Sequence, residues 1–185
     1  MTTLCRPSAD QVPITHAEPG SAHLKDPLTI TSIVAWLIGA GSPQCFTDRM
    51  LQEWFSDYPG GRIRHPVTGI DDSIAAPHWD DILARQNGLL RGYDIGSQRI
   101  AWVAHAVTDW CGDTGALIGL DARLRPPNYL GDITTFWGRV KGKRLSDGKG
   151  YVECEITGEN QYRDVTITAT ADVSLPLRSA VREEA

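Results

Sequence analysis

The segment Gly92–Asp113, GYDIGSQRIAWVAHAVTDWCGD, carries the clearest chemical signal in this sequence. Its apolar residues recur at helical spacing, which predicts one buried helix that the chain enters through glycines and leaves at Gly112. The first N–H groups of a helix have no partner within it, and the helix dipole adds partial positive charge there. A helix start of this kind can hold and polarise a carbonyl oxygen.

Ionisable side chains precede this helix and could exchange protons with a bound molecule. Asp71, Asp72, His78 and Asp80 lie within ten residues of one another. A carboxylate and an imidazole on one loop can divide the removal and the delivery of a proton through a single bound water. The structural alternative stays open, because His78 could cap a helix and the Asp71–Asp72 pair could belong to a turn. We expect His105, in the middle of the helix, to be a core histidine.

The composition favours one globular domain. The chain has 185 residues, 41% of them hydrophobic and 22% charged, and its net charge is −5. That charge argues against nucleic acid or an anionic membrane as a partner. The four cysteines and five histidines show none of the usual zinc spacings, so we expect no metal site. The first residues resemble no signal peptide, and we expect a cytoplasmic protein.

Helices are predicted for the first half of the chain, after an irregular arm over residues 1–26. Asp26-Pro27 is expected to begin a helix whose apolar face continues to Leu37, and a second helix should carry Met50–Phe55. Residues 59–77 read as a loop. A short helix should follow from His78 and end at Asn87-Gly88, the usual C-terminal signal.

Strands are predicted for the second half of the chain, because the hydrophobic period changes to two after Gly112. We expect a four-strand meander whose first strand points Ile118, Leu120, Ala122 and Leu124 to one side. Ser146-Asp147-Gly148 should form a hairpin turn, and residues 158–160 a second turn. The last strand alternates from Val165 to Leu175, and the tail 177–185 follows. This pattern indicates an α+β domain with an antiparallel sheet.

Several short motifs point to one known family. Asp72 and Ser73 precede His78, Ala84 follows it by six positions, and glycines lead into the long helix. The later strings are RLRPP over residues 123–127, Gly131-Asp132, GRV over 138–140 and ENQ over 159–161. From about residue 72 to 176 the chain resembles the MaoC-like acyl dehydratases, or (R)-specific enoyl-CoA hydratases. The resemblance implies a hotdog fold, in which an antiparallel sheet wraps around a central helix. It assigns residues 71–176 to the core of a single domain over 27–176 and residues 27–70 to an additional helical part.

The resemblance implies roles for individual residues. Asp72 and His78 would be the catalytic pair of a hydratase or dehydratase, and the Gly96 N–H would hold the thioester oxygen. Asp71, Asp80 and Arg99 would support them. Arg123 and Arg125 would contact the phosphates of coenzyme A. The substrate would be an acyl-CoA with a bulky, steroidal or branched acyl group, without a further cofactor. The family pairs its sheets, so a homodimer or a hetero-oligomer with another hotdog subunit is expected.

The sequence departs from the family motif at the catalytic loop. The family's aspartate lies five residues before its histidine, where this chain has Ser73, and Ile74–Pro77 replace its Asn-Pro. A shifted alignment would place Ser42 and Thr47 at the catalytic positions, without an ionisable pair. The departures favour a non-catalytic acyl-CoA-binding hotdog subunit as an alternative. A hotdog thioesterase, which would also use a carboxylate near a helix N-terminus, is a third.

Overall fold

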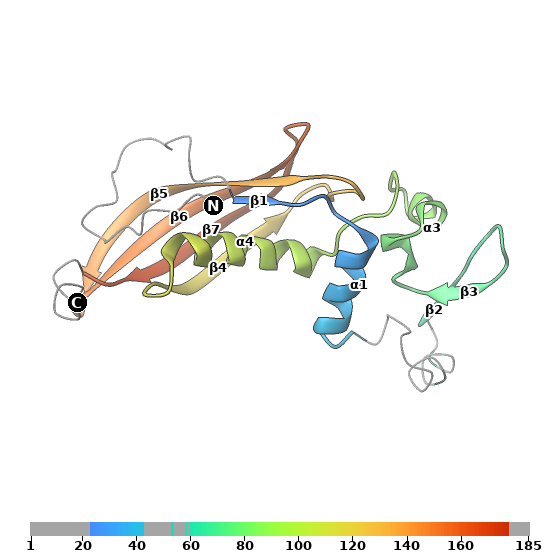
Figure 1. Cartoon of the computed structure of the whole chain (residues 1–185), viewed down its shortest axis with the longest axis horizontal. Coiled ribbons are helices and arrows are strands. Elements are labelled where there is room, and N and C mark those ends of the chain that lie inside the picture. Colours follow the sequence, from blue (N-terminus) through green and yellow to red (C-terminus); the bar gives the residue numbers. More distant parts are fainter. Residues whose placement is uncertain (1–22, 43–52, 54–57, 59, 178–185) are drawn as a thin grey trace. The chain divides into compact units, whose positions relative to one another are not determined.

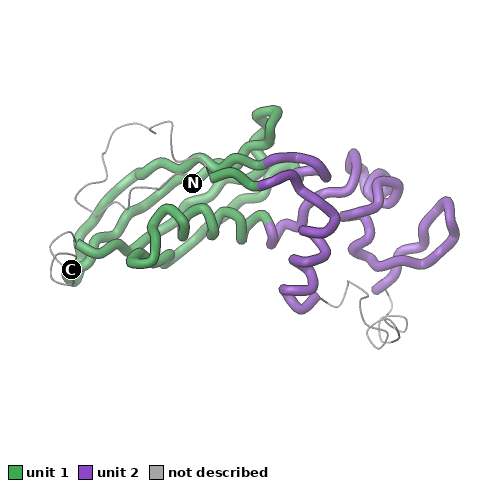
Figure 2. The backbone as a smooth tube through the Cα atoms, viewed as in Figure 1, with its two compact units in different colours: residues 1–25, 99–126, 134–185 green, residues 26–98, 127–133 purple. Residues whose placement is uncertain are grey.

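The structure is a computed structural model, and it describes residues 23–42, 53, 58 and 60–177. The chain forms two compact units (Figure 2). Unit 1 contains residues 1–25, 99–126 and 134–185, and unit 2 contains residues 26–98 and 127–133. Unit 2 continues through residue 70 to Gln98, and the predicted division of the domain at residue 70 stays a prediction. The predicted helix around Met50–Phe55 lies outside the described residues except for Glu53.

Unit 1 is built on one five-stranded antiparallel sheet with the order β1-β5-β6-β7-β4 (Figure 1). Its strands are β1 His23–Lys25, β4 Ala116–Leu124, β5 Thr134–Ser146, β6 Lys149–Asn160 and β7 Val165–Leu175. Only β5, β6 and β7 form a meander. The prediction of a four-strand meander was wrong, because β4 pairs with β7 at the far edge. The arm predicted over residues 1–26 also ends differently, since residues 23–25 pair with β5.

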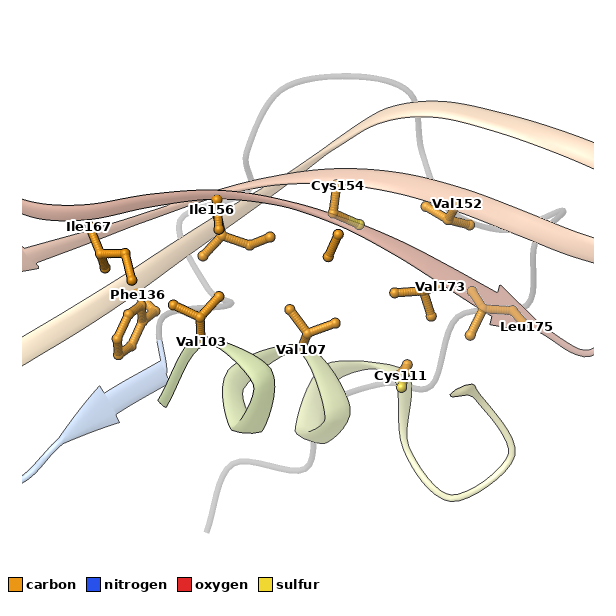
Figure 3. Close-up of a cluster of buried hydrophobic side chains, with 12 residues drawn as sticks. Val103, Val107, Cys111, Phe136, Val152, Cys154, Ile156, Ile167, Val173 and Leu175 are labelled. Carbon is orange, nitrogen blue, oxygen red and sulfur yellow. The ribbon is translucent and has the colours of Figure 1, made fainter. Parts of the chain in front are cut away.

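The long helix α4 runs from Gly96 to Cys111, and Gly112 ends it with a positive φ of 65°. Val103, Val107 and Cys111 point from α4 onto the sheet (Figure 3). They meet buried side chains of β5, β6 and β7, among them Phe136 and Ile167. A helix covered by an antiparallel sheet is the predicted hotdog arrangement. The opposite face of α4 is more open than predicted, and His105 and Asp109 are exposed on it.

Two strand details differ from the simple alternating pattern. β4 contains a bulge between Leu117 and Gly119, which turns Ile118 outward, so that 60% of Ile118 is exposed. Leu117, Leu120 and Ala122 pack against the core instead. β6 continues to Asn160, so the second turn lies over residues 161–164 rather than 158–160. The predicted turn at 146–148 is confirmed, and Asp147 and Gly148 both adopt a positive φ.

Unit 2 contains the helices α1, Ile30–Gly39, and α3, Asp81–Gln86, with the 3₁₀ turn η1 at Ala76–His78. Thr29 caps α1 through a reciprocal capping box with Ser32, so α1 begins three residues later than the Asp26-Pro27 prediction. The predicted loop over residues 59–77 holds a hairpin of β2, Arg62–Arg64, and β3, Asp71–Ser73. Its turn depends on the His65 Nδ1 atom, which accepts the N–H groups of Val67 and Thr68.

Gly158 tests how closely the sheet of unit 1 is packed. In Gly158→Ala the new Cβ would lie 2.6 Å from Ile167 Cγ2 and 2.7 Å from Phe136 Cε1. We expect this overpacking to cost about 1–3 kcal/mol of unfolding free energy, measured by urea denaturation. Gly138→Ala is the matched control, because its Cβ meets only the Glu155 carbonyl oxygen, at 4.0 Å. Equal stability of the two variants would contradict the packing described here.

Candidate functional site

His78 ends the 3₁₀ turn η1, and its ring is held by the segment that leads into α4. Nδ1 of His78 lies 2.9 Å from the carbonyl oxygen of Tyr93. A carbonyl only accepts, so Nδ1 carries the proton and, in the neutral ring, Nε2 keeps its lone pair. The Tyr93 ring packs against the imidazole, with 4.3 Å between the ring centroids. One nitrogen of His78 is therefore fixed as a donor, and the other is left as a base.

Burial of His78 lowers its pKa from the usual value of 6.5. The Tyr93 carbonyl and the negative charge of Asp94 oppose this shift, because both stabilise the imidazolium, but burial outweighs them. His78 is consequently a neutral imidazole at pH 7. A neutral ring with a free lone pair can remove a proton from water, and the nearby carboxylate stabilises the charge that results.

The segment Gly92–Asp94 is fixed by backbone contacts on both sides. The Tyr93 N–H donates to the His78 carbonyl at 3.2 Å, and the Leu130 N–H donates to the Gly92 carbonyl at 2.9 Å. A Cβ on Gly92 would lie 2.6 Å from Leu130 Cδ1 and 2.8 Å from the His78 carbonyl oxygen. Only glycine permits this approach without displacing a neighbour. The glycine before the helix thus brings His78 to the Tyr93 carbonyl.

Asp94 and Asn128 form a buried polar pair at the site, and no sequence motif predicted it. Asp94 is 1% exposed and Asn128 is fully buried. The Asn128 Nδ2 atom donates to Asp94 Oδ2 at 2.8 Å, and the Asp94 N–H donates to the Asn128 carbonyl at 2.9 Å. Asn128 follows two prolines, where the sequence alone indicates only a turn. The position of Asn128 in the chain could have indicated its role. It follows the RLRPP string at the end of a strand and precedes the Gly131-Asp132 motif.

Asp132 of that motif has a structural role. Its carboxylate accepts the Tyr129 N–H at 2.8 Å and lies 3.4 Å from the Arg91 guanidinium. The Leu28 N–H donates to the Asp132 carbonyl at 2.9 Å. These contacts join the turn over residues 129–132 to the segments before α4 and α1. They hold the polar pair of Asp94 and Asn128 in place.

Gly96 is the first residue of α4, so its N–H has no acceptor within the helix. The neighbouring residues are held by α1. The Trp36 indole donates to Ser97 Oγ at 3.2 Å, and the Gln98 amide donates to the Ser32 carbonyl at 3.1 Å. The start of α4 therefore has fixed backbone N–H groups. They lie in the same compact unit as His78 and Asp94.

The other predicted carboxylates have local partners. Asp72 lies in β3 and accepts the N–H of its neighbour Ser73 at 2.6 Å. Asp71 pairs with Arg64 at 3.4 Å. Asp80 caps α3 by accepting the N–H groups of residues 82 and 83, and it pairs with His65 at 3.3 Å. The described contacts of His78 thus run to Tyr93 and Asp94, and those of Asp72 to its own strand. The pairing of Asp72 with His78 stays a prediction.

Arg99 is buried within unit 1 and fastens the backbone. It is 3% exposed, and Nη1 donates to the carbonyls of Arg125, Pro126 and Thr166 at 3.2, 2.9 and 2.5 Å. These contacts support the chain after β4, and the expected support of a catalytic carboxylate by Arg99 stays a prediction. These contacts explain why a buried position of α4 holds an arginine. Each one satisfies a backbone carbonyl that burial separates from water.

Arg123 and Arg125 line an open hollow of unit 1, on the outer side of β4, β6 and β7. Thr157, Thr168 and Thr170 line it as well, and so do the carboxylates of Asp121 and Glu155. Two cations and two carboxylates give this hollow little net positive charge. The contact with the phosphates of coenzyme A that was predicted for the two arginines stays a prediction, and the acidic neighbours argue against it.

Comparison with known proteins shows the fold. No protein-family model and no curated protein sequence matches the chain. Solved structures do match. A chain of the ChsH1-ChsH2 complex from Mycobacterium tuberculosis is 21% identical with a TM-score of 0.56, over 83% of this chain and 92% of that one. The (R)-hydratase from A. caviae involved in PHA biosynthesis is 14% identical with a TM-score of 0.60, over 90% and 98%. A MaoC-like dehydratase is 20% identical with a TM-score of 0.61, over 93% and 42%.

These likenesses confirm the predicted α+β hotdog fold, which the chain shares with MaoC-like dehydratases and (R)-hydratases. At 14–21% identity they extend to the fold alone. Among the described residues, no helix is both long enough and apolar enough to span a membrane.

The coupling between Asp94 and His78 can be measured directly. Asp94→Asn removes the negative charge that raises the pKa of His78, so we expect that pKa to fall further below 6.5. The measurement is the NMR shift of the His78 Cε1 proton across a pH titration. Asp72→Asn is the matched control and should leave the titration of His78 unchanged. A His78 pKa that responds to residue 72 and not to residue 94 would contradict the site described here.

Proposed function

We propose that this chain is a hotdog enzyme of the hydratase and dehydratase type, acting on an acyl-CoA thioester. The observation that carries the proposal is His78, a half-buried neutral imidazole with Nδ1 fixed on the Tyr93 carbonyl, in the same compact unit as the start of α4. The shared fold of an (R)-hydratase and a MaoC-like dehydratase supports it. A homodimer or a pair with another hotdog subunit, and a bulky acyl group, belong to the same proposal.

The chemistry adds water across the C2–C3 double bond of a 2-enoyl thioester. Nε2 of His78 takes a proton from water while the water oxygen bonds to C3. The electron pair of the double bond moves toward the thioester, whose oxygen becomes enolate-like and is held by the Gly96 N–H. A proton then bonds to C2, and the reverse sequence removes water. Asp72 is proposed to relay to C2 the proton that His78 took from water, so that both side chains return to their starting states, while Asp94 stabilises the transient imidazolium.

A non-catalytic acyl-CoA-binding subunit is the second candidate, and one observation favours it. Ser73 stands where the family's aspartate is expected, and the Asp72 carboxylate is engaged with the Ser73 N–H. One structure of the same fold belongs to a complex of two named proteins, ChsH1 and ChsH2. In this case the chain would bind a thioester and a catalytic hotdog partner would supply the carboxylate. A thioesterase is the third candidate, since it would use the same thioester-binding helix start.

Substitution of His78 tests the proposed base. We expect His78→Gln to lower the kcat of crotonyl-CoA hydration by about 100-fold or more, because the amide cannot take up the proton. In the native protein the rate should fall only at a pH well below 6.5, because burial lowers the pKa at which His78 becomes protonated. Asp72→Asn measured alongside shows whether the predicted carboxylate takes part. Full activity of His78→Gln would rule out the proposed role.

A matched pair of substitutions at Gly96 tests the proposed oxyanion donor. Gly96→Pro deletes the N–H at the first helical position, where proline is well tolerated. Gly96→Ala adds a methyl group and keeps the N–H. We expect kcat to fall by about 100-fold in the proline variant, and much less in the alanine variant. Equal losses would show that shape, rather than the N–H, matters at this position.

Two product assays separate the three candidates. Hydration consumes the enoyl thioester without releasing a thiol, whereas a thioesterase releases free coenzyme A. We expect the first outcome with crotonyl-CoA or with a longer, ring-bearing enoyl-CoA. Binding of the saturated butyryl-CoA without turnover of any enoyl-CoA would instead favour the non-catalytic subunit. Thiol release would favour the thioesterase.

A further inference from the structure

Three metal-binding side chains converge in unit 1, on residues that the proposed reaction does not use. His105 and Asp109 lie one turn apart on α4, and His23 comes from the edge strand β1. One ligand atom from each lies within 4.8 Å of the other two. We propose that His23, His105 and Asp109 form a binding site for a divalent transition-metal ion of the Zn²⁺ type.

The two distances from Asp109 to the histidine nitrogens suit a tetrahedral ion. Asp109 Oδ2 lies 3.2 Å from His23 Nδ1 and 3.3 Å from His105 Nε2. Ligands that are about 2.0–2.1 Å from a zinc ion lie about 3.3–3.4 Å from one another. A charge-assisted hydrogen bond between a ring nitrogen and a carboxylate is shorter, about 2.7–2.9 Å. The two nitrogen–oxygen distances at Asp109 Oδ2 therefore match the ligand–ligand distances around a zinc ion better than the lengths of two hydrogen bonds.

The ligand atoms are set by rigid elements. His105 and Asp109 are four residues apart, which places both side chains on one face of a helix. His23 is fixed by the pairing of β1 with β5, where it lies opposite Phe136. The two imidazole rings meet edge to face, with 4.9 Å between their centroids. Nε2 of His23 is buried with no hydrogen-bond partner among the described residues, so Nδ1 is the nitrogen that can take a ligand.

The donor set selects the kind of ion. Two imidazole nitrogens and one carboxylate oxygen suit zinc, cobalt or nickel, whereas Mg²⁺ and Ca²⁺ prefer oxygen ligands. Three protein ligands leave a fourth position for water. The side chains of His105 and Asp109 are 56% and 42% exposed, so an ion can reach the cluster from solvent. An ion bound here would join β1 to α4 and stabilise the folded chain.

Lys25 competes with the proposed ion. Its ammonium group contacts Nδ1 of His105. The ammonium group can only donate a hydrogen bond, so Nδ1 must carry the lone pair and Nε2 the proton. A metal ion would need the lone pair on Nε2. The ion can therefore bind only when Lys25 moves away and the proton changes nitrogen. A neutral side chain at position 25 would remove both this tautomer preference and the repulsion between two cations.

The experiment titrates the metal-stripped, full-length protein with Zn²⁺ by calorimetry and with Co²⁺ by absorption spectroscopy. We expect one ion per chain, a higher Tm with Zn²⁺, and a tetrahedral Co²⁺ spectrum without the charge-transfer band of thiolate ligands. His23→Ala, His105→Gln and Asp109→Asn should each weaken binding by about tenfold or more. His65→Gln is the matched control, because His65 forms a two-residue pair with Asp80, and it should bind as the native chain does.

Lys25 gives an independent test in the opposite direction. Lys25→Gln should tighten Zn²⁺ binding by about fivefold, because it removes a nearby positive charge and can accept the new Nδ1 proton. The proposal is overturned if no saturable binding occurs, or if binding persists unchanged in all three ligand variants. A thiolate band would also overturn it. None of these readouts depends on hydratase activity, so the proposal stands or falls separately from the proposed function.

Discussion

The close approach of two backbone segments at Gly92 is the constraint on which the candidate site depends. With no side chain there, His78 and Tyr93 exchange two hydrogen bonds, one through the backbone and one through the imidazole. The same contact sets which nitrogen of His78 donates and which is left as a base. Any Cβ at position 92 would displace Leu130 or the His78 carbonyl. The chemistry proposed for the imidazole therefore rests on a residue that takes no part in it.

The ionisable groups of the two units differ in how far they are open to solvent. In unit 2 burial keeps His78 neutral, while Asp94 lies buried beside it with the amide of Asn128 as a donor. The pKa of a half-buried imidazole beside a buried carboxylate responds strongly to nearby charge, which is the property that a proton-transfer site requires. In unit 1 the cluster of His23, His105 and Asp109 is partly open to solvent. An ion can reach His105 and Asp109 from solvent, and this setting suits reversible metal binding better than catalysis.

The sequence predicted those elements whose pattern is local. α4 and β7 follow from their apolar periods, and the turn at Asp147-Gly148 follows from residues that tolerate positive φ. Features that depend on distant partners escaped prediction. The outward turn of Ile118 needs a bulge against β7, and the hairpin over residues 62–73 needs the His65 side chain to close its turn. Asp94 and Asn128 are 34 residues apart, so no spacing rule joins them.

His105 shows why the function of a side chain can depend on strand register. Its apolar neighbours in the sequence indicated a core position, yet it lies on the open face of α4. The i, i+4 spacing with Asp109 offers two metal ligands, and two such ligands are common on helix surfaces without any ion. The third ligand comes from residue 23, and it is brought into range only because β1 pairs with β5 in the register that sets His23 opposite Phe136. A shift of one residue would turn His23 to the other face of the sheet and leave an ordinary ion pair on the helix.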